Sequence, residues 1–121
     1  MGMKDFVQNV QEYSARGQDY TYVELSDSGS GASATLVSGL EDKYIKLVGF
    51  IISVDGAGKV EIKVGNDIVM HLEFSQRTTL PVYVPFPILV DKGLTVSVTF
   101  TADNAPAMCY ITTVYHYETI E

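Results

Sequence analysis

Apolar and polar residues alternate with a period of two along much of the chain after residue 43. In the segment 59–64, Val60, Ile62 and Val64 lie in one phase and three charged side chains lie in the other. The segments 68–74 and 94–101 repeat this alternation. A period of two is typical of antiparallel strands that bury one face and expose the other to water. We therefore predict three half-buried strands in these segments, with Ile68 and Leu94 at the start of their inward rows.

Two further segments predict strands of a different kind. The segment 43–54 has apolar residues in both phases and is interrupted by Gly49, which predicts a central strand covered on both faces and bent at the glycine. The turn at 55–58 predicts a hairpin to the strand that follows. The segment 80–86 contains Pro81 and Pro85, so we expect an edge strand or a crossing at a corner.

The number and spacing of the strands indicate the fold class. With the last strand at 107–117 and shorter ones at 20–25 and 32–38, the chain has about eight strands, and turn residues recur roughly every 8–12 positions. Val, Ile, Thr, Tyr and Phe make up 36 of the 78 residues from position 44 onward but 10 of the first 43. This enrichment is typical of strands. We predict an all-β antiparallel sandwich, jelly-roll-like rather than immunoglobulin-like.

The N-terminal segment follows another period. Between residues 4 and 16, Phe6, Val7, Val10 and Tyr13 recur at helical spacing, and Gly17 is suited to end a helix. We therefore predict a short helix or extended arm over residues 1–19, followed by a single sandwich domain over residues 20–121. Two alternatives stay open for this segment: it packs on its own sandwich, or it becomes ordered against a partner.

Composition and charge narrow the function classes. The chain has 15 acidic residues against 8 basic ones, a net charge of −7, and is 46% hydrophobic. A composition this apolar excludes a disordered acidic tail, and the negative charge argues against nucleic acid and anionic membranes as partners. No apolar run is long enough to span a bilayer or to form a signal peptide. We expect a soluble protein made in the cytoplasm.

The residues that carry chemistry are few and isolated. Cys109 and His116 are seven positions apart, so they point to opposite faces of a strand, and neither His71 nor His116 belongs to a metal-binding spacing. We expect a buried, inert cysteine and surface histidines. The stretch 26–31 is expected to be a flexible loop. The sequence thus supports no catalytic residue, metal site or cofactor, and we expect that the protein is not an enzyme.

The last strand is apolar in both phases, which predicts that the N-terminal segment or another subunit covers it. Its tyrosines also suit a sugar-binding platform, although tyrosine packs equally well as an ordinary strand residue. The candidates for such a platform are Tyr83, Tyr110, Tyr115 and Tyr117.

The order of segments resembles a known group of proteins. The matching stretches are LVSGL at 36–40, the long strand at 44–53, the run from Pro85 to Val98 with its turn-Gly-Leu-x-Val-x-Val element, and the closing strand at 109–118 with Tyr-x-Tyr. This layout resembles the small β-sandwich proteins of tailed-bacteriophage virions, which include capsid decoration (cement), head-fibre and tail-associated proteins.

The resemblance implies a non-enzymatic protein located on the virion after synthesis in the host cytoplasm. It implies that the protein decorates or stabilises the capsid by binding the major capsid or a tail protein, and that it forms homo-oligomers, with a trimer favoured. The alternative is a carbohydrate-binding module or a receptor-binding fibre or tail domain. The residues expected to bind the partner are Phe6, Val7, Val10, Tyr13, Tyr115 and Tyr117.

Overall fold

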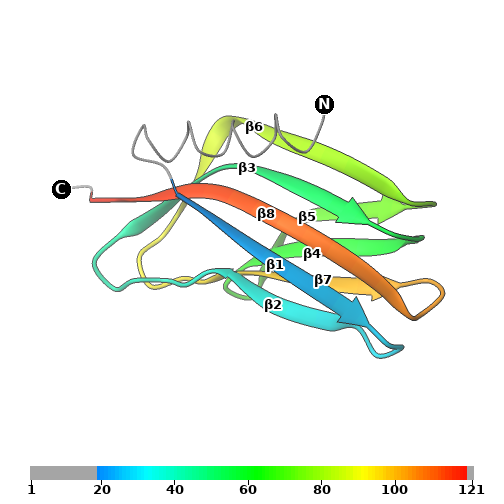
Figure 1. Cartoon of the computed structure of the whole chain (residues 1–121). Coiled ribbons are helices and arrows are strands. Elements are labelled where there is room, and N and C mark those ends of the chain that lie inside the picture. The colour runs from blue at the N-terminus through cyan, green and yellow to red at the C-terminus, as the bar shows by residue number, and fades with distance from the viewer. Residues whose placement is uncertain (1–18, 120–121) are drawn as a thin grey trace.

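The computed structural model describes residues 19–119, apart from the side chains of residues 83–87. The described chain forms eight strands in two four-stranded antiparallel sheets (Figure 1). The strands are β1 (Asp19–Asp27), β2 (Ala32–Val37), β3 (Tyr44–Val54), β4 (Gly58–Val64), β5 (Asp67–Phe74), β6 (Thr78–Val90), β7 (Val96–Ala102) and β8 (Ala107–Glu118).

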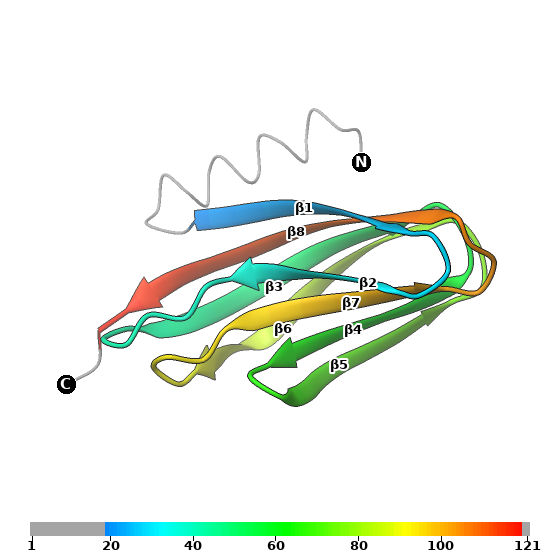
Figure 2. The same cartoon turned by 90° about the horizontal axis from the view of Figure 1, so that it is seen from below.

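The strand order is that of a jelly roll. Sheet A has the order β1-β8-β3-β6 and sheet B the order β2-β7-β4-β5, so most chain neighbours lie in different sheets. Figure 2 shows the two sheets as stacked layers. Eight strands in two such sheets define the double-sheet jelly roll. The predicted fold class is therefore confirmed, and the proline-containing β6 is an edge strand, as the sequence predicts.

The core lies between the sheets and is built from the inward rows that the period of two predicts. Val96, Val98 and Phe100 of β7 are fully buried, as are Val60 and Ile62 of β4. Leu36, Val37 and Phe74 of sheet B are buried as well, and sheet A contributes Leu25, Ile45, Leu47, Phe50, Ile52, Val54, Val90 and Ile111. Burial of this apolar surface is the dominant favourable term for folding.

A β-bulge explains the unusual pattern of β3. The register with both neighbouring strands shifts between Leu47 and Gly49, which leaves Val48 as an extra residue. Because of the shift, Leu47 faces the core before the bulge and Phe50 faces it afterwards. Apolar residues in both sequence phases thus reach the same core. The expected irregularity at Gly49 is present as a bulge.

The hairpin predicted at residues 55–58 is wrong. β3 pairs with β6 and β8, whereas β4 pairs with β5 and β7, so this turn carries the chain from one sheet to the other. The amide of Asp55 donates to Met108 O at 3.1 Å, and its carboxylate accepts from Met108 N at 2.8 Å. These bonds fasten the crossing to sheet A. A local turn pattern does not distinguish such a crossing from a hairpin.

Two predicted inward positions are also wrong. Ile68 is 52% exposed because a register shift in the β4–β5 hairpin places it opposite Lys63, on the outer face. Leu94 precedes β7 and is 39% exposed. Irregularities at strand ends move these side chains out of the row that the alternation predicts.

Asp27 orders the loop between β1 and β2, which the sequence predicted to be flexible. Its carboxylate accepts hydrogen bonds from the backbone amides of Gly29 (2.8 Å), Gly31 (2.8 Å) and Ala102 (2.7 Å). The bonds to the Ala102 and Gly29 amides lower the pKa of this buried carboxyl below its ordinary value. The loop is therefore tied both to itself and to the end of β7.

Candidate functional site

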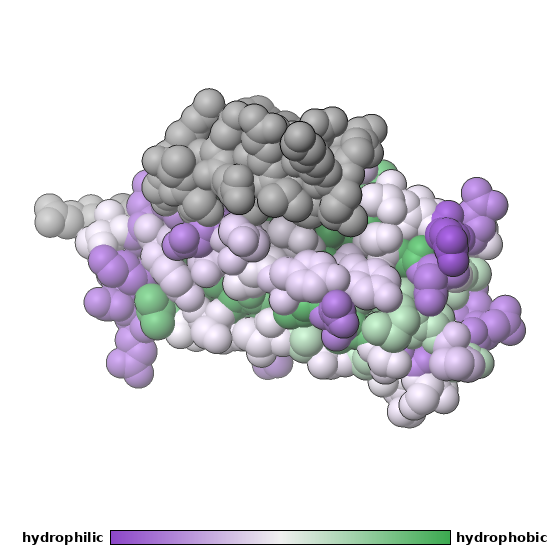
Figure 3. Space-filling model, in the orientation of Figure 1, coloured by the Kyte–Doolittle hydropathy of each residue, from purple (hydrophilic) through white to green (hydrophobic). Residues whose placement is uncertain are grey.

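The outer face of sheet A carries the features most suited to binding. The register aligns outward residues of all four strands in rows, and one row runs from Tyr22 through Thr112 and Ile51 to Pro81. In the space-filling view, the coloured part of this face is mostly pale, weakly polar surface, and strongly polar side chains lie mainly toward its two ends (Figure 3). An antiparallel sheet with one wet face would carry mostly polar side chains there.

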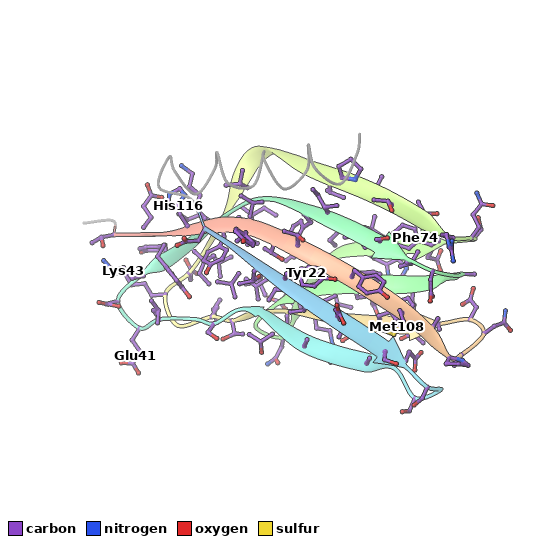
Figure 4. The ribbon with its side chains drawn as sticks, viewed as in Figure 1. Tyr22, Glu41, Lys43, Phe74, Met108 and His116 are labelled. Carbon is purple, nitrogen blue, oxygen red and sulfur yellow. The ribbon has the colours of Figure 1, made fainter. Side chains whose placement is uncertain are left out.

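Aromatic side chains gather on the β1 and β8 part of this face. Tyr20 is 49% and Tyr22 53% exposed, and Tyr110 and Met108 follow on β8 at the next outward positions. We call these four residues the tyrosine patch; Figure 4 labels Tyr22 and Met108 within it. The Tyr22 hydroxyl donates to Glu24 Oε1 at 3.1 Å. Partial desolvation, followed by this contact with Glu24, raises the pKa of Tyr22, so its hydroxyl stays protonated at neutral pH.

A second group lies beside the tyrosine patch, on the two central strands of sheet A. It consists of Val48, Gly49, Ile51, Thr112 and Val114, which we call the central patch. Thr112 and Val114 are only 5% and 6% exposed, although they point away from the core. Gly49 pairs with Val114 and brings no side chain, so another chain can approach the backbone closely at this point.

The residues predicted to bind a partner are distributed differently. Tyr115 and Tyr117 lie in the inward phase of β8, where they pack against the core at one end of the sandwich. Their rings meet edge to face at 5.5 Å, and the Tyr117 hydroxyl donates to Ser38 O at 2.6 Å. The other predicted residues lie outside the described part of the chain, namely Phe6, Val7, Val10 and Tyr13.

The platform tyrosines proposed from the sequence divide in a similar way. Tyr110 does lie on the outer face of sheet A, whereas Tyr115 and Tyr117 do not. Tyr83 pairs with Gly49 through its backbone. Tyr20 and Tyr22 were not among the residues predicted from the sequence, and the available signal was their alternation with Thr21 and Val23 along β1.

Cys109 and the two histidines occupy separate places in the sandwich. Cys109 is fully buried, and desolvation, with a smaller effect of Asp55, raises its pKa to about 12. His116 lies on the outer face of sheet A, so it points away from the thiol. His71 lies on the outer face of sheet B, with its ring nitrogens 3.4 Å from Glu61 and 3.7 Å from Glu73. This arrangement activates no nucleophile.

Other kinds of site are scarce among the described residues. Within residues 19–119, no group of three or more His, Cys, Asp or Glu side chains is arranged to hold a metal ion. The same residues include no helix that is long and apolar enough to cross a membrane. A surface depression of about 300 Å³ lies at one end of sheet B between Lys59, Phe74 and Asp103. Glu73 and Ser75 also line it.

Comparisons with known proteins support the fold. No protein-family model and no curated protein matches the sequence. Among solved structures, the chain is similar to a subunit of the Bacillus endospore appendages, with a TM-score of 0.52 and 10% identity over 86% of this chain and 88% of that one. PirA has a TM-score of 0.47 and 8% identity over 76% and 92% of the two chains.

A carbohydrate-binding module of family 29 has a TM-score of 0.43 and 15% identity over 84% of this chain and 73% of the other. At these identities the likeness concerns the fold alone. The fold therefore defines an antiparallel β-sandwich protein.

Proposed function

We propose that the protein is a non-enzymatic structural subunit that associates with itself and binds the surface of a larger assembly. The observation that carries this proposal is the tyrosine patch on the outer face of sheet A, where Tyr20 and Tyr22 are each about half exposed. Tyrosine and methionine are enriched in the buried centres of protein interfaces, and tyrosine often dominates their binding energy. Such a surface is better suited to binding another protein than to catalysing a reaction.

The assembly we propose is a virion of a tailed bacteriophage, as the resemblance of the strand layout implies. The partner is then a major capsid or tail protein, and the self-associated form is a trimer. Glu24 lies beside the tyrosine patch, and the chain carries a net charge of −7, so the docking surface on the partner is expected to be neutral or basic.

The association we propose is non-covalent. The similar appendage subunit belongs to pili described as disulfide-linked. This chain has a single cysteine, which is buried and whose pKa is raised to about 12. A thiol in that state is poorly suited to disulfide exchange. Apolar burial at the tyrosine patch is the remaining source of affinity.

Sedimentation equilibrium of the full chain tests the self-association. We expect a trimer that dissociates on dilution, and a double variant, Tyr20→Ser with Tyr22→Ser, that weakens association at least roughly tenfold. Ile68→Ser is the matched control, because Ile68 is 52% exposed but lies on the outer face of sheet B. A chain that is monomeric throughout, or equal effects of the two changes, would overturn the proposal.

The virion location has a separate test. Genes for capsid, portal or tail proteins beside the gene for this chain, together with co-sedimentation of the purified protein with those virions, are the expected result. Neighbouring genes of unrelated metabolism and no co-sedimentation would contradict it.

Carbohydrate binding is a second candidate, favoured by the same tyrosines. Tyr20, Tyr22 and Tyr110 lie on one face, with the Glu24 carboxylate hydrogen-bonded to Tyr22 as a polar contact for sugar hydroxyls. A glycan array separates the two functions. Binding to a defined glycan that is lost in the Tyr22→Ser variant would support the lectin-like function, and an array without signal would exclude it.

A further inference from the structure

The strand β5 forms an edge of sheet B that is open to further pairing. It lies at the end of the order β2-β7-β4-β5, and β4 is its only partner among the described strands (Figure 2). Backbone N–H and C=O groups along its other side are therefore free to bond a strand of another chain. Apolar side chains of β5 are also open to water, with Ile68 at 52% and Val69 at 43% exposed. β5 is thus a candidate site for extension of the sheet.

The other sheet edges of the described chain carry features that discourage such pairing. β6 contains three prolines, which cannot donate to a neighbouring strand. On the opposite side of the sandwich, Thr21 Oγ1 of β1 donates to Leu36 O of β2 at 2.7 Å, and a bulge interrupts β2 after Thr35. β5 contains neither proline nor lysine. Its own bulge lies at Val69, so the residues that follow pair regularly with β4.

We propose that β5 of a second copy of this chain pairs with this edge, antiparallel and about a two-fold axis at Leu72. In this register Leu72 faces its own counterpart, and Met70 faces Phe74 of the second copy. Met70 and Leu72 are partly buried against the core, and Phe74 is buried within it. The pairing therefore joins the cores of two sandwiches through a row of apolar side chains.

The outer face of the strand is complementary in the same register. His71 faces Glu73 of the second copy, and the two-fold axis produces this pair twice. Within its own chain, His71 Nδ1 lies 3.4 Å from Glu61 Oε2 of β4. The imidazole thus lies between two carboxylates in one row across the extended sheet, and cross-strand pairs of this kind are favourable.

Neighbouring registers lack this complementarity. An axis at Glu73 places two glutamates opposite each other, and an axis at Met70 places Asp67 opposite Glu73 of the second copy. Like charges in directly opposite positions are destabilising. An axis at His71 leaves each Glu73 opposite an apolar side chain. The charges along β5 therefore select the axis at Leu72.

This contact is separate from the self-association proposed above, because β5 belongs to sheet B and the tyrosine patch lies on sheet A. The paired segment runs from Met70 to Phe74, which is much shorter than the about 20–30 residues that each side of a stable interface contributes. We therefore expect a weak contact that forms where many copies are held close together. Its role is to join neighbouring subunits side by side on the surface of a larger assembly.

Disulfide trapping in the concentrated full chain tests the pairing. One chain carries His71→Cys and the other Glu73→Cys, and both carry Tyr20→Ser with Tyr22→Ser, so the tyrosine patch does not contribute. Directly opposite residues have Cβ atoms about 4.5–5.5 Å apart, near the separation in a disulfide, whereas diagonal neighbours are about 7–8 Å apart. We expect the one-to-one mixture, oxidised with glutathione disulfide, to yield at least roughly fivefold more 71–73 crosslinked dimer than either chain yields alone.

Thr99→Cys, on the outer face of the central strand β7, is the matched control. His71 and Glu73 are exposed, so both variants are expected to fold, and far-UV circular dichroism checks this. Cys109 is buried and gives the same background in every sample. A mixture that yields no more dimer than the control, or a higher yield from one variant alone, would overturn the proposal. The latter result would place the axis elsewhere on β5.

Discussion

The two outer faces of the sandwich are built on the same strand geometry but carry different surfaces. On sheet B, β4 presents Lys59, Glu61 and Lys63 outward, opposite threonine and serine side chains of β7. On sheet A, the corresponding positions form the tyrosine patch and the central patch. Sheet B is a wet face in the ordinary sense, whereas the outer face of sheet A also carries tyrosine, methionine, isoleucine and valine side chains. This difference is the reason why we propose sheet A as the side of the molecule that binds a partner.

A lysine introduced on each outer face should give the largest difference in the free energy of unfolding between the two faces. Val114→Lys puts an unpaired cation at a position that is 6% exposed, and we expect it to lower the free energy of unfolding by about 3 kcal/mol. Thr99→Lys places the same side chain opposite Glu61 on sheet B and should change stability by less than about 0.5 kcal/mol. Urea denaturation measures both. Equal losses of stability would mean that the two positions do not differ in burial.

The Asp27 carboxylate, which links β1 of sheet A to β7 of sheet B, should make the free energy of unfolding depend on pH in the acid range. Because three amide hydrogen bonds lower the pKa of Asp27 in the folded state, its stabilisation is complete above the ordinary aspartate value of 3.8. It is lost as the pH falls from there through the lowered folded pKa. We expect Asp27→Asn to be less stable than the parent at pH 7 and to lose less stability between pH 5 and pH 2. Parallel stability curves for the two proteins would contradict this assignment.

Removal of a hydroxyl inside the core should have a smaller effect of opposite sign, namely a gain in the free energy of unfolding. Thr113 is fully buried on the inner face of sheet A, and its Oγ1 has no hydrogen-bond partner among the described residues. Thr113→Val keeps the shape and removes this unsatisfied group, so we expect a gain of about 1 kcal/mol. Thr112→Val on the outer face is the neighbouring control. A loss of stability in Thr113→Val would show that the hydroxyl is satisfied in solution.

The smallest effect is expected on the polar face. His71 lies between Glu61 and Glu73, and its side chain is 45% exposed. Exposed ion pairs of this kind contribute little, so His71→Gln should change the free energy of unfolding by less than about 0.5 kcal/mol at pH 6. Thermal unfolding at low and high salt measures it. A loss above 1 kcal/mol would give sheet B's outer face a role that the comparison denies it.

Much of the fold could be predicted because the alternation of apolar and polar residues indicates which side chains face the core. The inward rows of β4 and β7 follow the sequence directly, and the prolines of β6 indicate an edge. Strand pairing could not be predicted in the same way. The turn after Val54 has the composition of a hairpin, yet β3 and β4 lie in different sheets, because the partners of β3 come from residues far along the chain.

The candidate site was only partly visible in the sequence. The apolar nature of β8 in both phases indicated a covered strand, but Tyr115 and Tyr117 pack inward at the end of the core. Tyr20 and Tyr22 became candidates once β1 was placed beside β8, since only that pairing brings them to the same face as Tyr110. A patch assembled from separate strands leaves no local motif.

The sequence by itself determined most of the strand positions and most of the apolar rows, because alternation and turn residues are local properties of the chain. The tertiary structure alone decided the jelly-roll order, the bulge that turns both phases of β3 to one core, and the location of the two patches on sheet A. These depend on pairings between distant segments. Such pairings are selected by packing of the whole core, which no single stretch of sequence encodes.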